Sequence, residues 1–343
     1  MDPPITFSTS LMNNKCLILL FLLALVSCTS SLSLMFSFYE TSCPNAEFMV
    51  RNTVRSASDS DPTVPGKLLR LLFHDCMVEG CDGSVLLEGN ATERSDPANA
   101  SLGGFSLIES AKRWLELFCP ETVSCADILA LAARDAVEYK VKVTAILLLR
   151  QAGGPSMEIT TGRRDGRSSL ASNVRDNIVD TSFTMDEMIK LFSSKGLSID
   201  DLVVLSGAHT IGLAHCSAFS DRFEDSNGRL VPVDDSLDKT YAAELAKQCP
   251  LGANGAITIN NDPETSILFD NQYYKNLASH KGLFQSDSVL FADERTRRRV
   301  AELAGNEESF LGSWGDSFLK LASLEVKTGE EGEIRRTCSL ING

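Results

Sequence analysis

Apolar side chains recur along most of the chain at the three- and four-residue spacing of helices. The clearest runs lie at 68–72, 128–132 and 185–192. Polar residues mark where such runs begin and end: the acidic stretch 198–201 precedes one of them, and Gly212 follows it in a turn. The alternation that is typical of strands is scarce, with 231–233 as its best example. The pattern predicts a mostly helical fold without internal repeats or low-complexity linkers.

One segment departs from this pattern. Residues 140–151 read KVKVTAILLLRQ, which is apolar and rich in β-branched side chains, and they lie between a predicted helix and the turn at 153–155. An apolar run of this kind fits either a buried strand or an extension of the helix. The pattern alone leaves both structures open.

The N-terminus has the layout of a secretory signal peptide. Lys15 precedes an apolar run at 16–26, and small residues follow at 27–31. We expect cleavage near 30–33, which assigns 1–31 to the signal peptide and 32–343 to the mature domain. The alternative is a membrane anchor, but this run is shorter than the roughly 18 residues of a span and no second run reaches that length.

Composition and charge narrow the class of protein. The chain has 343 residues, 43% of them hydrophobic, so it can build a sizeable core. Its net charge of −14 argues against a nucleic-acid partner or an anionic membrane. Without Cys16 and Cys28 of the signal peptide, eight of the ten cysteines remain. An even set in an exported chain indicates four disulfides, with about 105 possible pairings, rather than a zinc site, because no CxxC pair occurs.

Two of the four histidines have neighbours that suggest chemistry, although either alone fits a structural role. Arg70 and His74 are four residues apart, so a helix projects both from one face. A histidine that exchanges protons beside a fixed cation suits cleavage of a peroxide O–O bond, because the cation stabilises charge on the leaving oxygen. Small residues at 206–208 precede His209 and would let a flat cofactor approach the backbone. A neutral imidazole is a common ligand to haem iron.

Seven motifs, in order along the chain, carry a close resemblance to a known family. They are RLLFHDCMVEGCDGSVLL at 70–87, CPETVSCADILALAARDAV at 119–137, GRRDG at 162–166, VLSGAHTIG at 204–212, FDNQYY at 269–274, GLFQSD at 282–287 and GEIRRTC at 332–338. Together they resemble the class III secretory plant peroxidases over nearly the whole mature chain. The resemblance implies an all-α fold of two lobes with haem b between distal and proximal helices. It also implies an enzyme that reduces hydrogen peroxide while oxidising phenolic donors by one-electron steps.

The resemblance implies catalytic roles on the distal side of the haem. His74 would be the acid-base catalyst, Arg70 its partner, and Phe73 would shield the reacting oxygen. Asn99 would accept a hydrogen bond from the other ring nitrogen of His74, which keeps the nitrogen that faces the peroxide basic. Glu93 matches the carboxylate behind Asn99.

On the proximal side, the resemblance implies that His209 is the axial iron ligand and that Asp287 accepts its remaining N–H. Ser101 matches a residue near the haem propionates. Where the family has arginine and serine beside the propionates, this chain has Thr63 and Lys67. We hypothesise that Lys67 pairs with a propionate instead.

Two calcium sites are implied in the same way. The first comprises the side chains of Asp75, Asp82 and Ser84 with the carbonyls of Val78 and Gly80. The second comprises the side chains of Thr210, Asp262, Thr265 and Asp270 with the carbonyl of Leu268. All of these ligands are hard oxygen donors, which suits Ca²⁺. Each set includes the residue that follows a catalytic histidine, so we expect calcium loss to loosen the haem pocket.

The resemblance also implies how the cysteines and two charged residues pair. The disulfides would join Cys43 to Cys119, Cys76 to Cys81, Cys125 to Cys338 and Cys216 to Cys249. Asp127 and Arg163 match a buried ion pair of the family. At the exposed haem edge, where donors bind, Phe183 lies in the donor region and Val179 replaces the usual proline, which puts the range of donors in doubt.

The segment 140–151 has no counterpart in the family, so it is an insertion or a translated intron. A rival function, a secreted haem- or calcium-binding protein without turnover, gains support only from this segment. A catalase-like haem enzyme would need a tyrosine or thiolate ligand in a matching context, and none occurs. We expect a monomer in the cell wall or elsewhere in the apoplast, or in the vacuole, with Asn90 as a candidate glycosylation site.

Overall fold

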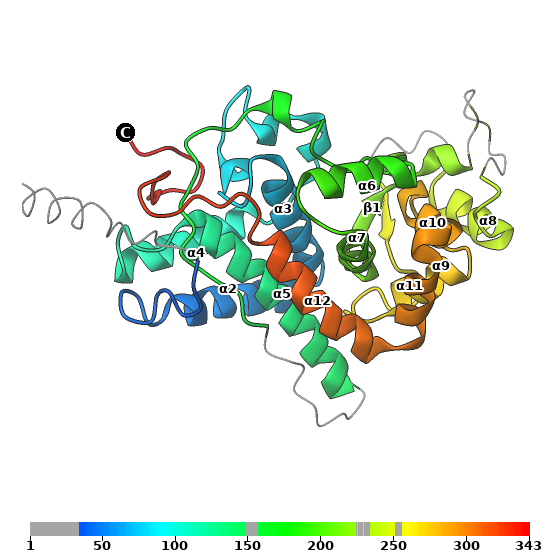
Figure 1. Ribbon diagram of the computed structural model, residues 1–343, viewed down its shortest axis with the longest axis horizontal. Coiled ribbons are helices and arrows are strands. Elements are labelled where there is room, and N and C mark those ends of the chain that lie inside the picture. The colour runs from blue at the N-terminus through cyan, green and yellow to red at the C-terminus, as the bar shows by residue number, and fades with distance from the viewer. Residues whose placement is uncertain (1–33, 148–156, 224, 226–228, 230–233, 251–255) are drawn as a thin grey trace, which may run out of the picture.

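The computed structural model describes residues 34–147, 157–223, 225, 229, 234–250 and 256–343, and over them the protein is predominantly helical (Figure 1). Eleven α-helices dominate this part of the chain. Its two named strands, β1 (Leu213–His215) and β2 (Thr258–Asn260), pair antiparallel with Ala214 opposite Ile259. The expectation of an all-α fold is confirmed.

The N-terminal lobe contains one helix that is buried along most of its length. Its helices are α2 (Ala46–Ser60), α3 (Val64–Val78), α4 (Phe105–Phe118) and α5 (Cys125–Leu147). α3 has Pro65 in its first turn, where the missing N–H costs no hydrogen bond. Leu68, Leu71 and Leu72 of α3 are almost fully buried in the lobe. Because these leucines fix the rotation of α3, they also fix the directions of Arg70 and His74 on the same helix.

The second lobe holds most of the remaining helices. They are α6 (Met185–Ser194), α7 (Ile199–Ser206), α8 (Lys239–Gln248), α9 (Gln272–Ala278), α10 (Gln285–Ala292) and α11 (Glu294–Gly305). α6 and α7 each begin with a capping box, formed by Thr184 with Glu187 and by Ser198 with Asp201. The acidic stretch 198–201 therefore starts a helix, as its sequence predicts.

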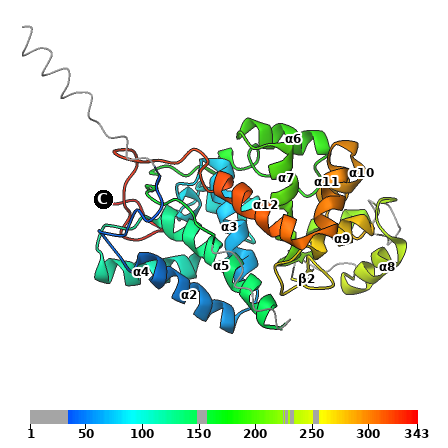
Figure 2. The ribbon, with the colours of Figure 1, turned by 60° about the horizontal axis from the view of Figure 1, so that its bottom comes forward.

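The last helix returns the chain from the second lobe to the first. α12 (Glu307–Leu321) runs from α11 towards α3 and α5 in both views (Figures 1 and 2). Immediately after it, the carbonyl of Ala322 accepts a hydrogen bond from Nε of Arg163 at 2.9 Å. Nη1 of Arg163 also lies 2.7 Å from Oδ1 of Asp127, and both side chains are fully buried. The expected ion pair is confirmed, and it fastens the end of α12 to the N-terminal lobe.

Four disulfides reinforce this arrangement. They join Cys43 to Cys119, Cys76 to Cys81, Cys125 to Cys338 and Cys216 to Cys249, which are the pairs that the resemblance implied. The first two lie in the N-terminal lobe, and the third joins this lobe to the C-terminal tail of the chain. Cys216–Cys249 lies in a smaller apolar cluster of the second lobe, with Phe219 and Leu245.

Some expectations concern residues outside the described part of the chain. The signal peptide at 1–31 and the alternating run at 231–233 lie there, as do residues 148–151 of the atypical segment. For residues 140–147 the structure selects one alternative, because α5 continues as helix to Leu147. Across the described residues, no helix combines the length and apolarity needed to cross a membrane.

We predict that the longest disulfide loop contributes most to stability. Replacing Cys125 and Cys338 by Ser should lower the free energy of unfolding by about 5 kcal/mol at most, because the bridge restricts 213 residues of the unfolded chain. Replacing Cys216 and Cys249, which are 33 residues apart, should cost about 4 kcal/mol. Urea unfolding of the two double variants measures both losses, and a larger loss for the shorter loop would contradict the entropic account.

Candidate active site

A cavity of about 770 Å³ lies between the two lobes. α3 contributes Arg70, Phe73 and His74 to its wall. The end of α7 and the 3₁₀ turn Gly207–Thr210 contribute Ala208 and His209. The fold thus brings both histidine motifs to one cavity, as the resemblance requires.

His74 is oriented by a short series of hydrogen bonds. Its Nδ1 lies 2.6 Å from Oδ1 of Asn99, and Nδ2 of Asn99 donates to the backbone carbonyl of Glu93 at 2.8 Å. Because the amide oxygen only accepts, Nδ1 of His74 carries the proton and Nε2 the lone pair. Glu93 therefore acts on Asn99 through its main chain, whereas its carboxylate accepts from Ser169. The contact observed between the two residues is therefore this main-chain one, and a carboxylate of Glu93 behind Asn99 stays a prediction.

The surroundings of His74 keep its ring neutral. Burial, together with the positive charge of Arg70, lowers the pKa of His74 to about 3 against the opposing effect of the hydrogen bond with Asn99. Arg70 is itself held in place, since Nη1 donates to the hydroxyl of Ser101 at 2.9 Å and Nη2 to the carbonyl of Ala98 at 3.1 Å. Ser101, which the resemblance places near the propionates, thus also orients the guanidinium.

His209 has a carboxylate partner in place of an amide. Its Nδ1 lies 2.8 Å from Oδ1 of Asp287, which also accepts from the hydroxyl of Tyr273 at 2.8 Å. The other oxygen of Asp287 accepts from the backbone N–H of Phe284 at 2.9 Å. Although burial raises it, the interaction with His209 and these hydrogen bonds bring the pKa of Asp287 below its ordinary value. The carboxylate stays charged, and Nε2 of His209 is left for a ligand in the cavity.

Of the small residues before His209, two leave room in the cavity and one allows close packing of the core. Ser206 and Ala208 line the cavity. Gly207 faces the other way, since a Cβ there would lie 2.5 Å from the hydroxyl of Tyr274 and 2.6 Å from the ring of Phe310. The glycine of this motif is required by the core behind His209.

The first predicted calcium set forms a buried acidic cluster beside α3. The carboxylates of Asp75 and Asp82 accept hydrogen bonds from backbone N–H groups of residues 83–85. Oγ of Ser84 is buried and, among the residues that the structure describes, has no hydrogen-bond partner. Burial and the charges of Asp82 and Glu93 raise the pKa of Asp75 well above its usual range. A cation at this position would match both the excess of negative charge and the unpartnered hydroxyl.

The two carbonyls assigned to this set already accept hydrogen bonds. That of Val78 accepts from Nζ of Lys195 at 3.4 Å, and that of Gly80 from the backbone N–H of Asp82 at 2.8 Å. A carbonyl oxygen has two lone pairs, so each can still approach a cation.

The second predicted set also converges on one point. The hydroxyls of Thr210 and Thr265 each lie between the carboxylates of Asp262 and Asp270, at distances of 3.1 to 3.4 Å. The backbone N–H of Leu268 donates to the carbonyl of Thr265 at 2.8 Å. Within the described ranges, no three His, Cys, Asp or Glu side chains gather to hold a metal. Each set has only two clustered carboxylates that can serve as ligands and is completed by hydroxyls and carbonyls.

The rim of the cavity agrees only partly with the sequence predictions. Val179 lines the cavity. Phe183, just before α6, packs against the core as Val179 also does, and its place in the donor region stays a prediction. Lys67 lines the cavity together with Thr63, but its ammonium group forms an ion pair with Asp61 at 2.9 Å.

Three further residues at the site were not predicted from the sequence. His215 and Asn261 line the cavity, and Tyr273 contacts Asp287. Tyr273 belongs to the FDNQYY motif, which could have signalled it, whereas nothing in the spacing of His215 or Asn261 indicates a place at the cavity.

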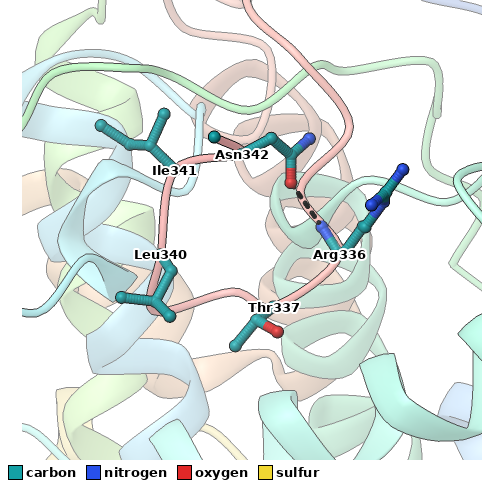
Figure 3. Close-up of a pocket in the computed structure, with 6 residues that line it drawn as sticks. Arg336, Thr337, Leu340, Ile341 and Asn342 are labelled. Atoms are coloured by element: carbon teal, nitrogen blue, oxygen red, sulfur yellow. Dashed lines mark hydrogen bonds between the residues drawn. The ribbon is translucent and has the colours of Figure 1, made fainter.

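A smaller hollow of about 260 Å³ lies at the C-terminus (Figure 3). It is lined by Arg336, Thr337 and 340–343, and the backbone N–H of Arg336 donates to Oδ1 of Asn342 at 3.1 Å. None of the predicted catalytic or ligating residues reaches it. The larger cavity is therefore the candidate active site.

Comparisons with known proteins give a consistent result. The family model described as Peroxidase matches residues 50–306. Peroxidase 46 and Peroxidase 18 of Arabidopsis thaliana are each 61% identical to the chain over 326 residues, which cover 95% and 94% of this chain and 96% and 95% of those proteins. Peroxidase 5 of Vitis vinifera is 43% identical over 310 residues, with 89% of this chain and 90% of that protein covered.

We predict that the charge of Arg70 contributes to the low basicity of His74. Replacing Arg70 by Leu should raise the pKa of His74 above about 3, because it removes a neighbouring positive charge. NMR titration of the ring resonances of His74 measures this value. Arg175→Leu is the control, since Arg175 also lines the cavity but pairs with Asp96. An unchanged value in Arg70→Leu would show that burial alone sets the pKa.

Proposed function

We propose that this protein, which belongs to the plant class III group of the peroxidase family, binds haem b in its cavity between His74 and His209. As a member of this family, it is an enzyme that oxidises substrates with hydrogen peroxide. The proposal rests on two histidines that line the same cavity, each with a hydrogen-bond partner on its Nδ1. Haem is the cofactor that the family implies. A cavity of about 770 Å³ has the size of a cofactor site.

The residues fit this cofactor. Nε2 of His209 would bind the iron, and the apolar side chains of Leu205, Phe284 and Phe318 on the cavity wall suit the faces of a porphyrin. Ser101 and Lys67 lie at the rim, where the propionates would need polar partners. Lys67 would have to leave Asp61 to serve as one. Bound haem supplies the redox centre at which the peroxide accepts electrons.

The protein moves the protons of the reaction. Hydrogen peroxide needs two electrons and two protons to become two molecules of water, and two donor molecules each supply one electron. His74, neutral and with the lone pair on Nε2, takes a proton from one peroxide oxygen and returns it to the other. The fixed charge of Arg70 stabilises the negative charge that develops on the departing oxygen. Phe73 closes the wall beside these two residues and keeps water away.

The proximal pair tunes the iron. A charged Asp287 that accepts the N–H of His209 gives the imidazole anionic character, and such a ligand stabilises oxidised iron. Tyr273 and the N–H of Phe284 keep the carboxylate in place while it is buried.

We assign one calcium ion to each of the two oxygen-rich sets. The first comprises Asp75, Val78, Gly80, Asp82 and Ser84, and the second Thr210, Asp262, Thr265, Leu268 and Asp270. Support comes from the buried carboxylates of Asp75, Asp82 and Asp262, and from the hydroxyl of Ser84, which has no hydrogen-bond partner among the described residues. Because Asp75 follows His74 and Thr210 follows His209, each ion would stiffen the segment that carries a functional histidine.

The proposed donors are small phenols that reach the haem edge near Val179, and the proposed setting is outside the cell or in the vacuole. Four disulfides support an oxidising compartment. Val179 is less rigid than the proline of the family, so the proposal extends to phenols in general and names no single donor. We propose that the protein acts as a monomer.

We predict that His74→Leu slows the reaction with hydrogen peroxide by about 10²- to 10⁴-fold, because no base remains to move the proton. The haem absorption band should be retained, since His209 still binds the iron. Stopped-flow spectroscopy after addition of peroxide measures the rate. His280→Leu, at an exposed position remote from the cavity lining, is the matched control and should react like the wild type. A His74→Leu protein that reacts at the wild-type rate would exclude His74 as the base.

We also predict that Asp287→Asn raises the reduction potential of the haem, because a neutral amide no longer gives His209 anionic character. Spectroelectrochemical titration measures the potential. Asp293→Asn changes an aspartate that caps α11 away from the cavity and should leave it unchanged. Equal potentials in all three proteins would show that Asp287 only positions the ring.

A further inference from the structure

Lys327 reaches into the first acidic cluster. Its Nζ forms an ion pair with Oδ2 of Asp82, whose side chain is 1% exposed, while that of Lys327 is 31% exposed. The other carboxylate oxygen of Asp82 accepts from the backbone N–H of Ser84 at 2.9 Å. One ligand oxygen of the proposed calcium site therefore already has a cationic partner that belongs to the chain.

The fold fixes this ammonium group in position. Lys327 and Asp82 are 245 residues apart in sequence. The carbonyl of Lys327 accepts from the backbone N–H of Arg164 at 2.8 Å, and the carbonyl of Leu324 accepts from that of Cys81 at 2.9 Å. The segment that carries Lys327 and the loop that carries Asp82 are thus joined by main-chain hydrogen bonds, so their contact is part of the tertiary structure.

The other charged groups nearby do not replace Lys327. Lys195 donates to the carbonyl of Val78, but its ion pair is with Glu325, outside the cluster. Arg335 is fully buried, but its Nη2 donates to the carbonyls of Asp82 and Gly83, at 3.2 and 2.8 Å, and not to a carboxylate. Asp75 accepts only from backbone N–H groups, and Glu93 adds further negative charge. Within the described residues, Lys327 is the cation that pairs with a carboxylate of this cluster.

We propose that Lys327 competes with calcium for Asp82, so that the cluster holds the ammonium group at low calcium and the metal ion at high calcium. An oxygen that accepts from an ammonium group is less available to Ca²⁺, and the two positive charges repel each other. The proposal rests on the calcium site proposed above. Its consequence is a site that stays partly neutralised without metal and binds calcium more weakly than the carboxylates alone would.

Two variants separate the charge of Lys327 from its hydrogen bond. Lys327→Gln can still donate to Asp82 but carries no charge, and Lys327→Arg keeps the charge. Equilibrium dialysis against radioactive calcium, with purified full-length mature protein, measures the affinity of each site. We expect Lys327→Gln to bind one of its calcium ions about tenfold or more tightly than the wild type does, and Lys327→Arg to bind it like the wild type.

A second measurement tests the other half of the proposal. In a chelator, Lys327→Gln should melt at a lower temperature than the wild type, because the acidic cluster loses its cation. In saturating calcium this difference should disappear. Lys320→Met is the matched control, since Lys320 also pairs with a buried carboxylate, that of Asp201 at 2.8 Å, but Asp201 is not one of the proposed calcium ligands. Its effect on the melting temperature should be the same with and without calcium.

The outcomes distinguish the two proposals. Equal calcium affinities of the wild type and Lys327→Gln, with calcium bound to both, would overturn the competition and leave the calcium sites in place. Absence of calcium binding to every variant would overturn the calcium sites and the competition together. A lower affinity in Lys327→Gln would show that the lysine supports the metal, which is the opposite of the proposal.

Discussion

An imidazole ring has two nitrogens, and the hydrogen bond made by one decides what the other can do. In this fold both functional rings are held through Nδ1, His74 by the amide oxygen of Asn99 and His209 by the carboxylate of Asp287. A neutral acceptor brings no charge to His74, which remains a weak base that can give back the proton it takes. A charged acceptor makes His209 a stronger electron donor. The same side chain is thus suited to two different functions because its partners differ in charge.

Asn99 and Asp287 can orient the two histidines only if they are themselves held in place. This depends on contacts between segments that are distant in the sequence. Asn99 lies in a stretch with only short 3₁₀ turns, where the carbonyl of Glu93 holds its amide. The fully buried carboxylate of Asp165 accepts from the backbone N–H groups of Cys125, Ala126 and Arg335, at 3.1, 2.8 and 2.9 Å. The start of α5 and the C-terminal tail therefore meet at one side chain. The tail beyond α12 is consequently part of the framework of the site.

Local patterns predicted what depends on local geometry. The spacing of Arg70 and His74 placed both on one helical face, and the acidic stretch 198–201 marked a helix start. Contacts between distant segments could be predicted only from the resemblance to the family. An example is the contact of His209 with Asp287, which lies 78 residues away in the sequence. Details that depend on the exact course of a loop were not predicted, such as the main-chain contact of Glu93 with Asn99 and the hydrogen bond of Tyr273 to Asp287. No short-range pattern encodes where such a side chain points once the whole chain has folded.

Charge explains why Lys327, a residue outside the seven family motifs, can matter for the site. The protein carries a net charge of −14 and nevertheless buries the carboxylates of Asp75, Asp82 and Glu93 beside α3. Backbone N–H groups donate to Asp75 and Asp82, and the hydroxyl of Ser169 donates to Glu93. These donors supply no net charge, so a cation is needed to offset the cost of burial. Asp75 follows His74 directly, and any change in the charge of this cluster acts on the end of the helix that carries the proposed base. A lysine at 327 places part of the required charge in the chain itself, and it thereby links the C-terminal segment to the stability of the distal wall.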